Sequence, residues 1–293
     1  MKLSDDIVIN GKRAMARSYA KINLTLDVTG TRSDGYHLIE TVMQTVNLSD
    51  IIIVDKYDGG IKISTNKNYL PVNNKNIAYK ATELFFKKLG KRHGAKILIH
   101  KNIPVAAGLA GGSGNGAAVL DALNLLYSNP FSQKELLEIG SELGADVPYC
   151  MTGGTQLASG IGEILTPLKP ISKHYVLLVT PPITVSTPWV YAEFDNIERK
   201  IFPNTKAMLN AIENDNYKAV CENLSNVLEG VTVKKYPVLR GIKEKLILNG
   251  ADGALMSGSG PTVFGFFSDY NKAKASHDSF SHMYKNVYLT TTI

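Results

Sequence analysis

The chain has 293 residues, of which 44% are apolar and 20% charged, and its formal net charge at pH 7 is +6. A single hydrophobic core stops growing at about 250–300 residues, so this length predicts two domains. The basic residues are scattered without flanking aromatic side chains, which argues against a nucleic-acid partner, and no apolar run is long enough to span a membrane or to act as a signal peptide.

The first third of the chain predicts mostly strands. Alternating apolar and polar residues predict a strand over residues 16–30, ended by the turn signal Asp34-Gly35. Branched residues predict further strands over 41–57 and 61–65, and 95–104 is another. Between them, residues 73–90 have an Asn-rich start, apolar residues at helical spacing and a closing glycine, which together predict a helix.

The segment 103–120 is unusually rich in glycine, with five glycines within nine positions. From Ala117 onward, good helix formers with apolar side chains predict a helix, so the glycine loop opens onto a helix N-terminus. Unpaired N–H groups and a partial positive charge make such an end suitable for phosphate. No Lys followed by Ser or Thr ends the loop, which excludes a P-loop, and the glycine spacing does not fit the dinucleotide fingerprint.

The rest of the chain mixes helices and strands. Residues 132–144 predict a helix with a serine cap, and 144–154 an irregular connection. Prolines that bracket an apolar strand from residue 167 onward mark a change in composition. This change predicts a domain boundary at about residue 165, with domains over 1–165 and 166–293. The second domain alternates elements of both kinds, which predicts an α+β architecture. Its expected strands are 175–181 and 262–268, and its expected helices are 205–224 and 238–250.

Three motifs in this order resemble those of the GHMP kinase superfamily, which includes galactokinase, homoserine kinase and mevalonate kinase. They are PVAAGLAGGSGNGAA (104–118), GADVPYCMTGGTQLASGIGE (144–163) and GALMSGSGPTVFGFF (253–267). Two further stretches, 16–46 and VSTPWVY at 185–191, resemble one branch of that superfamily. The resemblance implies an α+β GHMP kinase fold, with an N-terminal domain similar to ribosomal protein S5 domain 2, a ferredoxin-like C-terminal domain and an active site in the cleft between them.

By resemblance, the glycine segment binds the phosphates of ATP, with Mg²⁺ as the expected metal, although the motifs identify no metal ligand. The family usually has GGSSNAA where this chain has GGSGNGAA, so Gly114 removes a hydroxyl and Gly116 weakens the first helical turn by about 1 kcal/mol relative to Ala. The implied nucleotide-binding positions are Pro104, Gly108, Leu109, Ala110, Gly111, Gly112, Ser113 and Gly114, with Asn76 and Lys101 near the adenosine.

The resemblance also implies a catalytic pair. Asp146 matches the aspartate that takes the proton from the substrate hydroxyl, and Lys21 matches the lysine that keeps this aspartate ionised and neutralises developing charge. Asn23 lies two residues after Lys21, so in a strand both side chains project from one face. Asn23 is accordingly expected to contact the erythritol part of the substrate.

The remaining implied positions surround a small-molecule substrate that carries cytidine diphosphate. The branch in question phosphorylates the C2 hydroxyl of 4-diphosphocytidyl-2-C-methyl-D-erythritol, with ATP as donor, in the non-mevalonate route to isoprenoid precursors. A nucleobase needs an aromatic face together with a donor and an acceptor. The implied substrate contacts are Tyr36, His37, Thr187, Tyr191, Ser257, Gly258 and Gly260.

Other interpretations remain open at this point. A sibling kinase would act on a mevalonate-like, homoserine-like or sugar substrate, none of which has a base for the aromatic residues to sandwich. A catalytically silent sensor of the same fold is favoured only by Gly114. Cys150 and Cys221 lie far apart and outside any CxxC pair, which indicates neither a disulfide scaffold nor a zinc site and predicts a cytoplasmic protein. The sequence does not indicate an oligomeric state.

Overall fold

The computed structural model describes residues 7–91, 93–198 and 202–293. Its contacts divide the chain into two compact units that alternate along the sequence. Unit 1 comprises the described residues up to Ala20, Leu48–Val105 and Ala110–Gly153. Unit 2 comprises Lys21–Asn47, Ala106–Leu109 and Gly154–Ile293. The sequence boundary at about residue 165, which separates two consecutive domains, stays a prediction.

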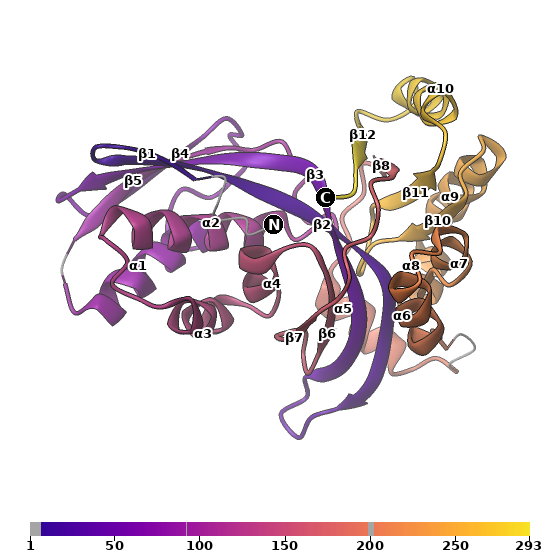
Figure 1. Ribbon diagram of the computed structural model, residues 1–293, viewed down its shortest axis with the longest axis horizontal. Coiled ribbons are helices and arrows are strands. Elements are labelled where there is room, and N and C mark those ends of the chain that lie inside the picture. The colour runs from indigo at the N-terminus through magenta and orange to yellow at the C-terminus, as the bar shows by residue number, and fades with distance from the viewer. Residues whose placement is uncertain (1–6, 92, 199–201) are drawn as a thin grey trace. The chain divides into compact units, whose positions relative to one another are not determined.

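Unit 1 contains a sheet with its helices on one face (Figure 1). The strand order is β1-β2-β3-β5-β4. The β1–β2 and β3–β5 pairs are antiparallel, and the β4–β5 pair is parallel. Along β2 the side chains of Arg13, Met15 and Arg17 are exposed while the alternating Ala14 and Ala16 are buried, which is the pattern of a half-covered sheet. The strand bounds are β1 (Val8–Asn10), β2 (Arg13–Thr31), β3 (His37–Tyr57), β4 (Ile61–Thr65) and β5 (Gly94–His100).

Four helices cover this sheet, and two of them begin as the sequence predicts. Asn76 caps the first helix by accepting a hydrogen bond from the Ala78 N–H, and Gly90 ends it with a φ of 68°. Ser132 and Glu135 form a reciprocal capping box at the start of the third. The helix bounds are α1 (Ile77–Leu89), α2 (Gly111–Leu126), α3 (Gln133–Leu143) and α4 (Asp146–Thr152).

Two expectations for unit 1 are wrong. Helix α2 begins at Gly111, not at Ala117, so most of the glycine run is helical. Neighbouring elements pack directly on this helix: a Cβ at Gly111 would lie 2.8 Å from both Lys101 Nζ and Ile103 Cγ2. The stretch expected to be an irregular connection forms α4, because its proline falls in the first helical turn, where the missing N–H costs nothing.

The C-terminal part of unit 2 has the topology expected of a ferredoxin-like domain. Its four-stranded sheet has the order β10-β11-β8-β12 with every neighbouring pair antiparallel, and helices connect β8 to β10 and β11 to β12. The α+β fold class predicted from the sequence is confirmed. The strand bounds are β8 (Tyr175–Thr180), β10 (Gly253–Met256), β11 (Val263–Phe267) and β12 (Asn286–Thr291).

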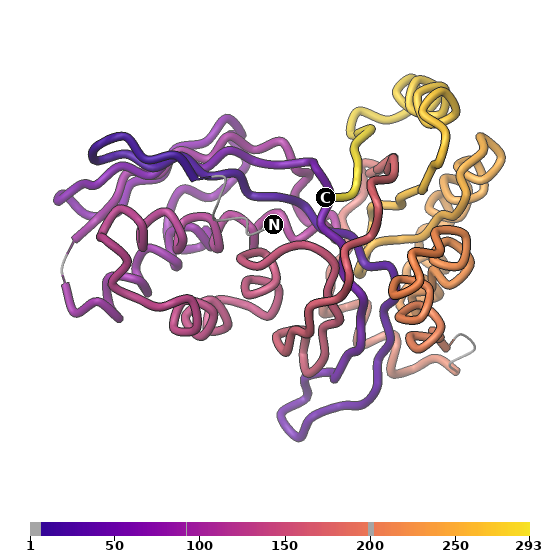
Figure 2. The backbone as a smooth tube through the Cα atoms, viewed as in Figure 1, coloured from indigo at the N-terminus to yellow at the C-terminus, as the bar shows by residue number. Residues whose placement is uncertain are grey.

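The helices of unit 2 pack on this sheet and on part of the long hairpin of β2 and β3, which Figure 2 traces. Leu26 and Val28 of β2 belong to the same buried cluster as Leu177 and Val179 of β8. The helix predicted over 205–224 is two helices, because Asp215 between them has a φ of 50°. The helix bounds are α5 (Thr187–Phe194), α6 (Thr205–Glu213), α7 (Tyr217–Glu222), α8 (Glu229–Lys235), α9 (Val238–Leu248) and α10 (Tyr270–Ser281).

Three short strands complete this unit: β6 (Thr155–Ser159) pairs with β3, β7 (Ile164–Pro167) with β6, and β9 (Ser225–Asn226) with β2. None of the helices in the described part of the chain combines the length and the apolar character needed to cross a bilayer.

Candidate active site

Residues 104–110 precede α2 and have an unusual backbone. Ala106, Gly108 and Ala110, at alternate positions, have φ values of 52°, 74° and 54°. Residues other than glycine rarely adopt this region, and chains that visit it at alternate positions turn successive N–H groups toward one side, where they can bind an anion. The backbone of this segment therefore fits the predicted role in phosphate binding.

Gly108 is held within unit 2 against a second glycine-rich turn, residues 257–260. The Ser257 hydroxyl donates to the Gly108 carbonyl over 2.9 Å, and a Cβ at Gly108 would lie 2.2 Å from the Ser257 carbonyl oxygen. The N–H of Lys21 donates to the Leu109 carbonyl over 3.2 Å. Only glycine fits at position 108, and residues 106–109 are tied both to β2 and to the second turn.

Lys21 and Asn23 project from the same face of β2, as their spacing predicts. Lys21 Nζ donates to Asn23 Oδ1 over 2.7 Å, and the Asn23 amide donates to Thr41 Oγ1 over 2.8 Å. The backbone N–H of Asn23 also donates to Ser257 Oγ at 3.3 Å. Both side chains are buried, at 5% and 2% exposure, so Asn23 is not a surface amide at the edge of a strand.

The second turn is fixed by a residue that the sequence does not single out. The Asn226 side chain donates to the carbonyls of Met256 and Gly258, each over 2.8 Å. Gly258 has a φ of 57° and Gly260 a φ of 85°, so both adopt the left-handed region that favours glycine. Asn226 holds the turn in this conformation, but nothing around it in the sequence marks this role, because its partners are about 30 residues away.

Thr187 lies beside the same turn, at the start of α5. Its hydroxyl is 2.8 Å from the Ser259 hydroxyl, and the Thr232 hydroxyl donates to the Ser259 carbonyl over 3.2 Å. Five predicted positions from distant parts of the sequence are thus brought together within unit 2. They are Lys21, Asn23, Gly108, Thr187 and Ser257.

The predicted aromatic contacts are also partly brought together. The rings of His37 and Tyr191 are stacked, with centroids 4.7 Å apart and an angle of 28° between planes. His37 Nε2 lies 2.8 Å from Asp195 Oδ1, a partner that sequence reasoning missed. Tyr36 is 61% exposed on the turn that precedes β3. A planar ring, a nitrogen-bearing ring and a fixed carboxylate thus lie in one place.

The N-terminus of α2 lies in unit 1 and holds Gly111, Gly112 and Ser113 in its first turn. Among the described residues, no side chain caps this end, where Ala110 is the N-cap residue. The first N–H groups of a helix have no intrahelical partner, so this end can receive an anion. Gly112 is exposed and Ser113 half-buried, whereas Gly111 and Gly114 are buried.

A buried network lies beneath this helix end. Lys101 Nζ donates to Asp50 Oδ2 (2.5 Å), to the Gly111 carbonyl (2.9 Å) and to Asn115 Oδ1 (3.1 Å). The Asn115 amide donates to the same Asp50 oxygen over 2.8 Å. Burial lowers the pKa of Lys101, although the Asp50 carboxylate opposes this change. Three protein oxygens thus accept hydrogen bonds from the ammonium group, which holds the first residue of α2.

The other two predicted positions of unit 1 lie at helix ends. The Asn76 side chain accepts from the Ala78 N–H (3.0 Å) and donates to the Pro71 carbonyl (2.7 Å), so its amide caps α1. Asp146 is the first residue of α4 and is half-buried.

Two family profiles match the chain: "GHMP kinases N terminal domain" over residues 76–154 and "GHMP kinases C terminal" over residues 208–286. The 4-diphosphocytidyl-2-C-methyl-D-erythritol kinase of Clostridium kluyveri is 48% identical over 279 residues, which cover 95% of this chain and 100% of the relative. The enzyme of the same name from Clostridium novyi is 48% identical over 277 residues, covering 94% and 99%. The chain belongs to this family of GHMP kinases.

A crystal structure of 4-(cytidine 5'-diphospho)-2C-methyl-D-erythritol kinase superposes with a TM-score of 0.80 at 30% identity, covering 95% of this chain and 98% of the other. A homoserine kinase from Cytophaga hutchinsonii has a TM-score of 0.72 at 18% identity, covering 97% and 94%, and shares the fold alone. The two-domain α+β fold and the kinase activity expected from the sequence motifs are therefore confirmed, and ATP use follows for a kinase of this family.

The sequence departure from the family at Gly114 has a structural reason. A Cβ at this position would lie 2.5 Å from Ser18 Oγ, which accepts a hydrogen bond from the Asn115 amide over 3.1 Å. The Ser18 hydroxyl thus occupies the space that a side chain at position 114 would need. Gly116 faces Ile77, whose Cγ1 would lie 3.1 Å from an added Cβ.

We expect Gly114→Ala to destabilise the wild-type protein but to stabilise the Ser18→Ala variant. Alanine favours a helix interior by about 1 kcal/mol over glycine, but its Cβ displaces the Ser18 hydroxyl. Without that oxygen the nearest atom is Tyr19 O at 3.4 Å. Urea unfolding of the four proteins measures this difference in sign. Gly112→Ala is the control and is expected to stabilise both backgrounds, because its nearest neighbour, Ile77 Cγ2, is 4.0 Å away.

Asp121 lies in the interior of α2, only 8% exposed, and burial raises the pKa of its carboxyl to about 7. The pKa of this carboxyl is about 7 in the folded state but near 4 in the unfolded state. Its contribution to the free energy of unfolding is therefore fully present below about pH 4 and is lost as the pH rises to about 7. We therefore expect the wild type to lose on the order of 4 kcal/mol of unfolding free energy between pH 4 and pH 8 relative to Asp121→Asn, which has no carboxyl to titrate at this position.

Urea unfolding of both proteins between pH 4 and 8 measures this difference. Asp58→Asn is the control, because the Asp58 side chain is 95% exposed. A wild-type profile parallel to that of Asp121→Asn would show that this carboxyl does not titrate abnormally.

Proposed function

We propose that the chain transfers the γ-phosphoryl group of ATP to the C2 hydroxyl of 4-diphosphocytidyl-2-C-methyl-D-erythritol. The observation that carries this proposal is the convergence, within unit 2, of Lys21, Asn23, Gly108 and Ser257. These residues come from three distant parts of the sequence, and they place an ammonium group, an amide and two glycine-rich segments together. This combination suits a phosphorylated substrate, because backbone N–H groups and a cation both favour anions.

Asp146 takes the proton from the C2 hydroxyl, whose oxygen forms a bond to the γ-phosphorus while the bond to the bridging oxygen of ADP breaks. Lys21 neutralises the charge that develops between the hydroxyl and the phosphoryl group. The hydrogen bond from Lys21 Nζ to Asn23 fixes the direction of the ammonium group. Asn23 in turn is oriented by Thr41, so that the amide is positioned before the substrate arrives.

Tyr36 and His37 contact the cytosine, with the imidazole of His37 at its hydrogen-bonding edge. By resemblance Tyr191 is expected on the opposite side of the base from His37, but the two rings are stacked directly on each other, so the base does not lie between them. Because Asp195 lies 2.8 Å from His37 Nε2, it can fix the tautomer in which this nitrogen carries the proton and Nδ1 is an acceptor. Thr187 contributes a hydroxyl contact near the base, and the turn 257–260 contacts the diphosphate. In this proposal Lys101 and Asn76 support the nucleotide site indirectly, since their polar atoms are bonded to the protein.

Mg²⁺ is proposed as the metal that accompanies ATP, where it would neutralise charge on the transferred phosphoryl group. In the part of the chain that the structure describes, no group of three or more His, Cys, Asp or Glu side chains could hold a metal ion. Mg²⁺ does not require such a group, because it usually keeps several waters and binds through one or two carboxylates together with the substrate phosphates.

We also assign the enzyme to the cytoplasm, because its two cysteines, Cys150 and Cys221, are buried free thiols. A small-molecule substrate without nucleic acid is consistent with the scattered charge of the chain.

An assay of ADP release with three alternative acceptors tests the proposed function. We expect turnover with 4-diphosphocytidyl-2-C-methyl-D-erythritol and little with mevalonate or homoserine, because neither of these has a base for Tyr36 and His37 to contact. Faster turnover with mevalonate or homoserine would assign the chain to a sibling activity. ATP binding by calorimetry without ADP release in the presence of any acceptor would favour a sensor.

A further inference from the structure

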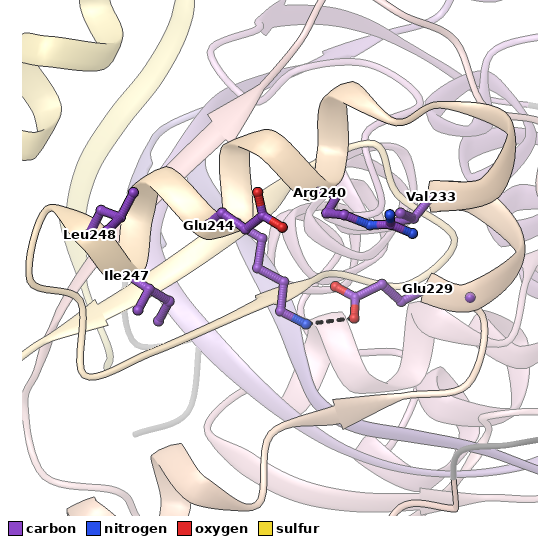
Figure 3. A pocket seen from close by; sticks show the side chains of 8 residues that line it. Glu229, Val233, Arg240, Glu244, Ile247 and Leu248 are labelled. Atoms are coloured by element: carbon purple, nitrogen blue, oxygen red, sulfur yellow. Dashed lines mark hydrogen bonds and ion pairs between the residues drawn. The ribbon is translucent and has the colours of Figure 1, made fainter.

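Helices α8 and α9 of unit 2 border an open groove of about 730 Å³ that contains none of the predicted site residues (Figure 3). Apolar and charged side chains both line it, and most of the lining residues come from α9. The lining residues are Glu229, Gly230, Val233, Arg240, Lys243, Glu244, Ile247 and Leu248.

The outward face of α9 forms one continuous stripe. Glu244 lies four residues after Arg240, and Ile247 and Leu248 lie three and four residues after Glu244, so all four side chains lie on one side of the helix. Leu248 is 85% exposed and Ile247 is 47% exposed. The opposite face of α9 already supplies three residues to the core: Leu239, Ile242 and Leu246. The two exposed apolar side chains are therefore not needed to attach α9 to its own unit.

One glycine in each of these helices, Gly230 in the lining of the groove and Gly241 on α9 outside that lining, is also not explained by the packing of the chain itself. An added Cβ at Gly230 of α8 or at Gly241 of α9 would have no heavy atom within 4 Å among its neighbours. Neither residue has a positive φ that would require glycine. Glycine inside a helix costs about 1 kcal/mol relative to alanine, and its usual benefit is the close approach of another backbone.

The charges in the groove are of two kinds. Glu229 is satisfied within the unit, since Lys243 Nζ lies 2.6 Å from its Oε2 and the Met256 N–H donates to its Oε1 over 3.2 Å. Arg240 and Glu244, one helical turn apart, form no ion pair or side-chain hydrogen bond with any residue that the structure describes. The dashed line in Figure 3 joins only Lys243 and Glu229. The stripe thus presents one unpaired cation and one unpaired anion.

We propose that this groove is the contact surface between two copies of the chain, with their α9 helices antiparallel across a two-fold axis. In an isologous contact, residue i of one copy faces residue j of the other and the reverse pair forms by symmetry. Arg240 of each copy then faces Glu244 of the other. Leu248 of each copy packs near the start of the other α9, where Val238 is 39% exposed.

A second copy fits this surface better than another partner because of the charge pattern. A groove for an acidic or basic peptide would carry unpaired charge of one sign, whereas the unpaired charges here are opposite and cancel. A surface that pairs with them must place an anion opposite Arg240 and a cation opposite Glu244. A second α9 in antiparallel orientation does this with its own Glu244 and Arg240. Gly241, close to the proposed axis, allows the two helix backbones to approach.

Charge reversal tests the pairing, with sedimentation equilibrium of the full chain as the measurement over roughly 1–100 µM, the range of a moderate dimer. We expect the wild type to dimerise, and Arg240→Glu or Glu244→Arg alone to raise the dissociation constant by about 10-fold or more, because each creates two like-charge contacts. The double variant R240E/E244R restores both pairs and is expected to dimerise again.

Lys218→Glu is the matched control, since Lys218 is 86% exposed and pairs with Glu222 elsewhere on unit 2; its dissociation constant should equal that of the wild type. Circular dichroism verifies that each variant is folded. Three outcomes would overturn the proposal: a monomeric wild type throughout this range, a dimer that neither single reversal weakens, or a double variant that remains as weak as the singles.

Discussion

Asp146→Ala is expected to reduce turnover by about 10²–10⁴-fold or more, the contribution typical of a positioned proton acceptor, while the fold remains intact. The side chain is half-buried at the first position of α4, where it is not part of the large apolar core. The loss should appear in kcat, because proton transfer takes place in the transition state rather than on binding. Coupled measurement of ADP release, together with thermal unfolding, separates the two effects.

Asp58→Ala serves as the control for this experiment, because it removes a carboxylate that is 95% exposed in the same unit. It should leave kcat unchanged. If Asp146→Ala retained a kcat within a few-fold of the wild type, Asp146 would have no role as proton acceptor.

The same assay tests whether Asp146 and Lys21 act as one functional pair. Residues that act together lose activity non-additively, so the double variant Asp146→Ala/Lys21→Met should be little slower than the slower of the two single variants. If the two losses multiplied instead, the residues would act independently and the proposed pairing would be wrong.

Asp50→Ala is expected to produce the largest loss of stability, about 3–5 kcal/mol in the free energy of unfolding. The side chain is fully buried, and it accepts hydrogen bonds from Lys101, Asn115 and the backbone N–H groups of Asn102 and Ile103. Removing it leaves an uncompensated ammonium group inside unit 1. Since Lys101 also holds the Gly111 carbonyl, ATP affinity should fall in parallel.

Urea unfolding of Asp50→Ala and of Asp55→Ala provides the comparison. Asp55 also pairs with a cation, at 2.7 Å from Arg13, but that guanidinium is largely exposed and solvent screens the pair. We expect a much smaller loss for Asp55→Ala. The double variant Asp50→Ala/Lys101→Met should recover part of the stability, because no buried charge is then left unpaired. Equal losses for the two single variants would show that burial does not strengthen the Asp50 interaction.

Local patterns in the sequence predict most of the fold. The helix cap at Ser132 and the alternation along β2 depend on neighbouring residues, and both are correct. The start of α2 at Gly111 could not be predicted, because the reason for its glycines lies elsewhere in the chain: a Cβ at Gly111 would meet Lys101 and Ile103, and one at Gly114 would meet Ser18. Glycine-rich sequence indicates a loop unless the packing partners are known.

The site shows the same limit. The spacing of Lys21 and Asn23 on one strand predicts a shared face, and the two side chains are hydrogen-bonded. The sequence does not predict the roles of Asn226, Asp195 and Asp50, because each forms its hydrogen bonds with residues more than 25 positions away. The predicted roles of the nucleotide- and substrate-binding residues remain to be tested by experiment.

Strands β2 and β3 each contribute residues to both compact units, which restricts how the protein can be divided. A fragment that begins after residue 165 would lack the hairpin segment Lys21–Asn47, and with it Leu26 and Val28 of the unit 2 core. Expression of the two sequence halves as separate polypeptides should therefore give an insoluble C-terminal product, and chimeras between family members need to exchange that hairpin together with the C-terminal half.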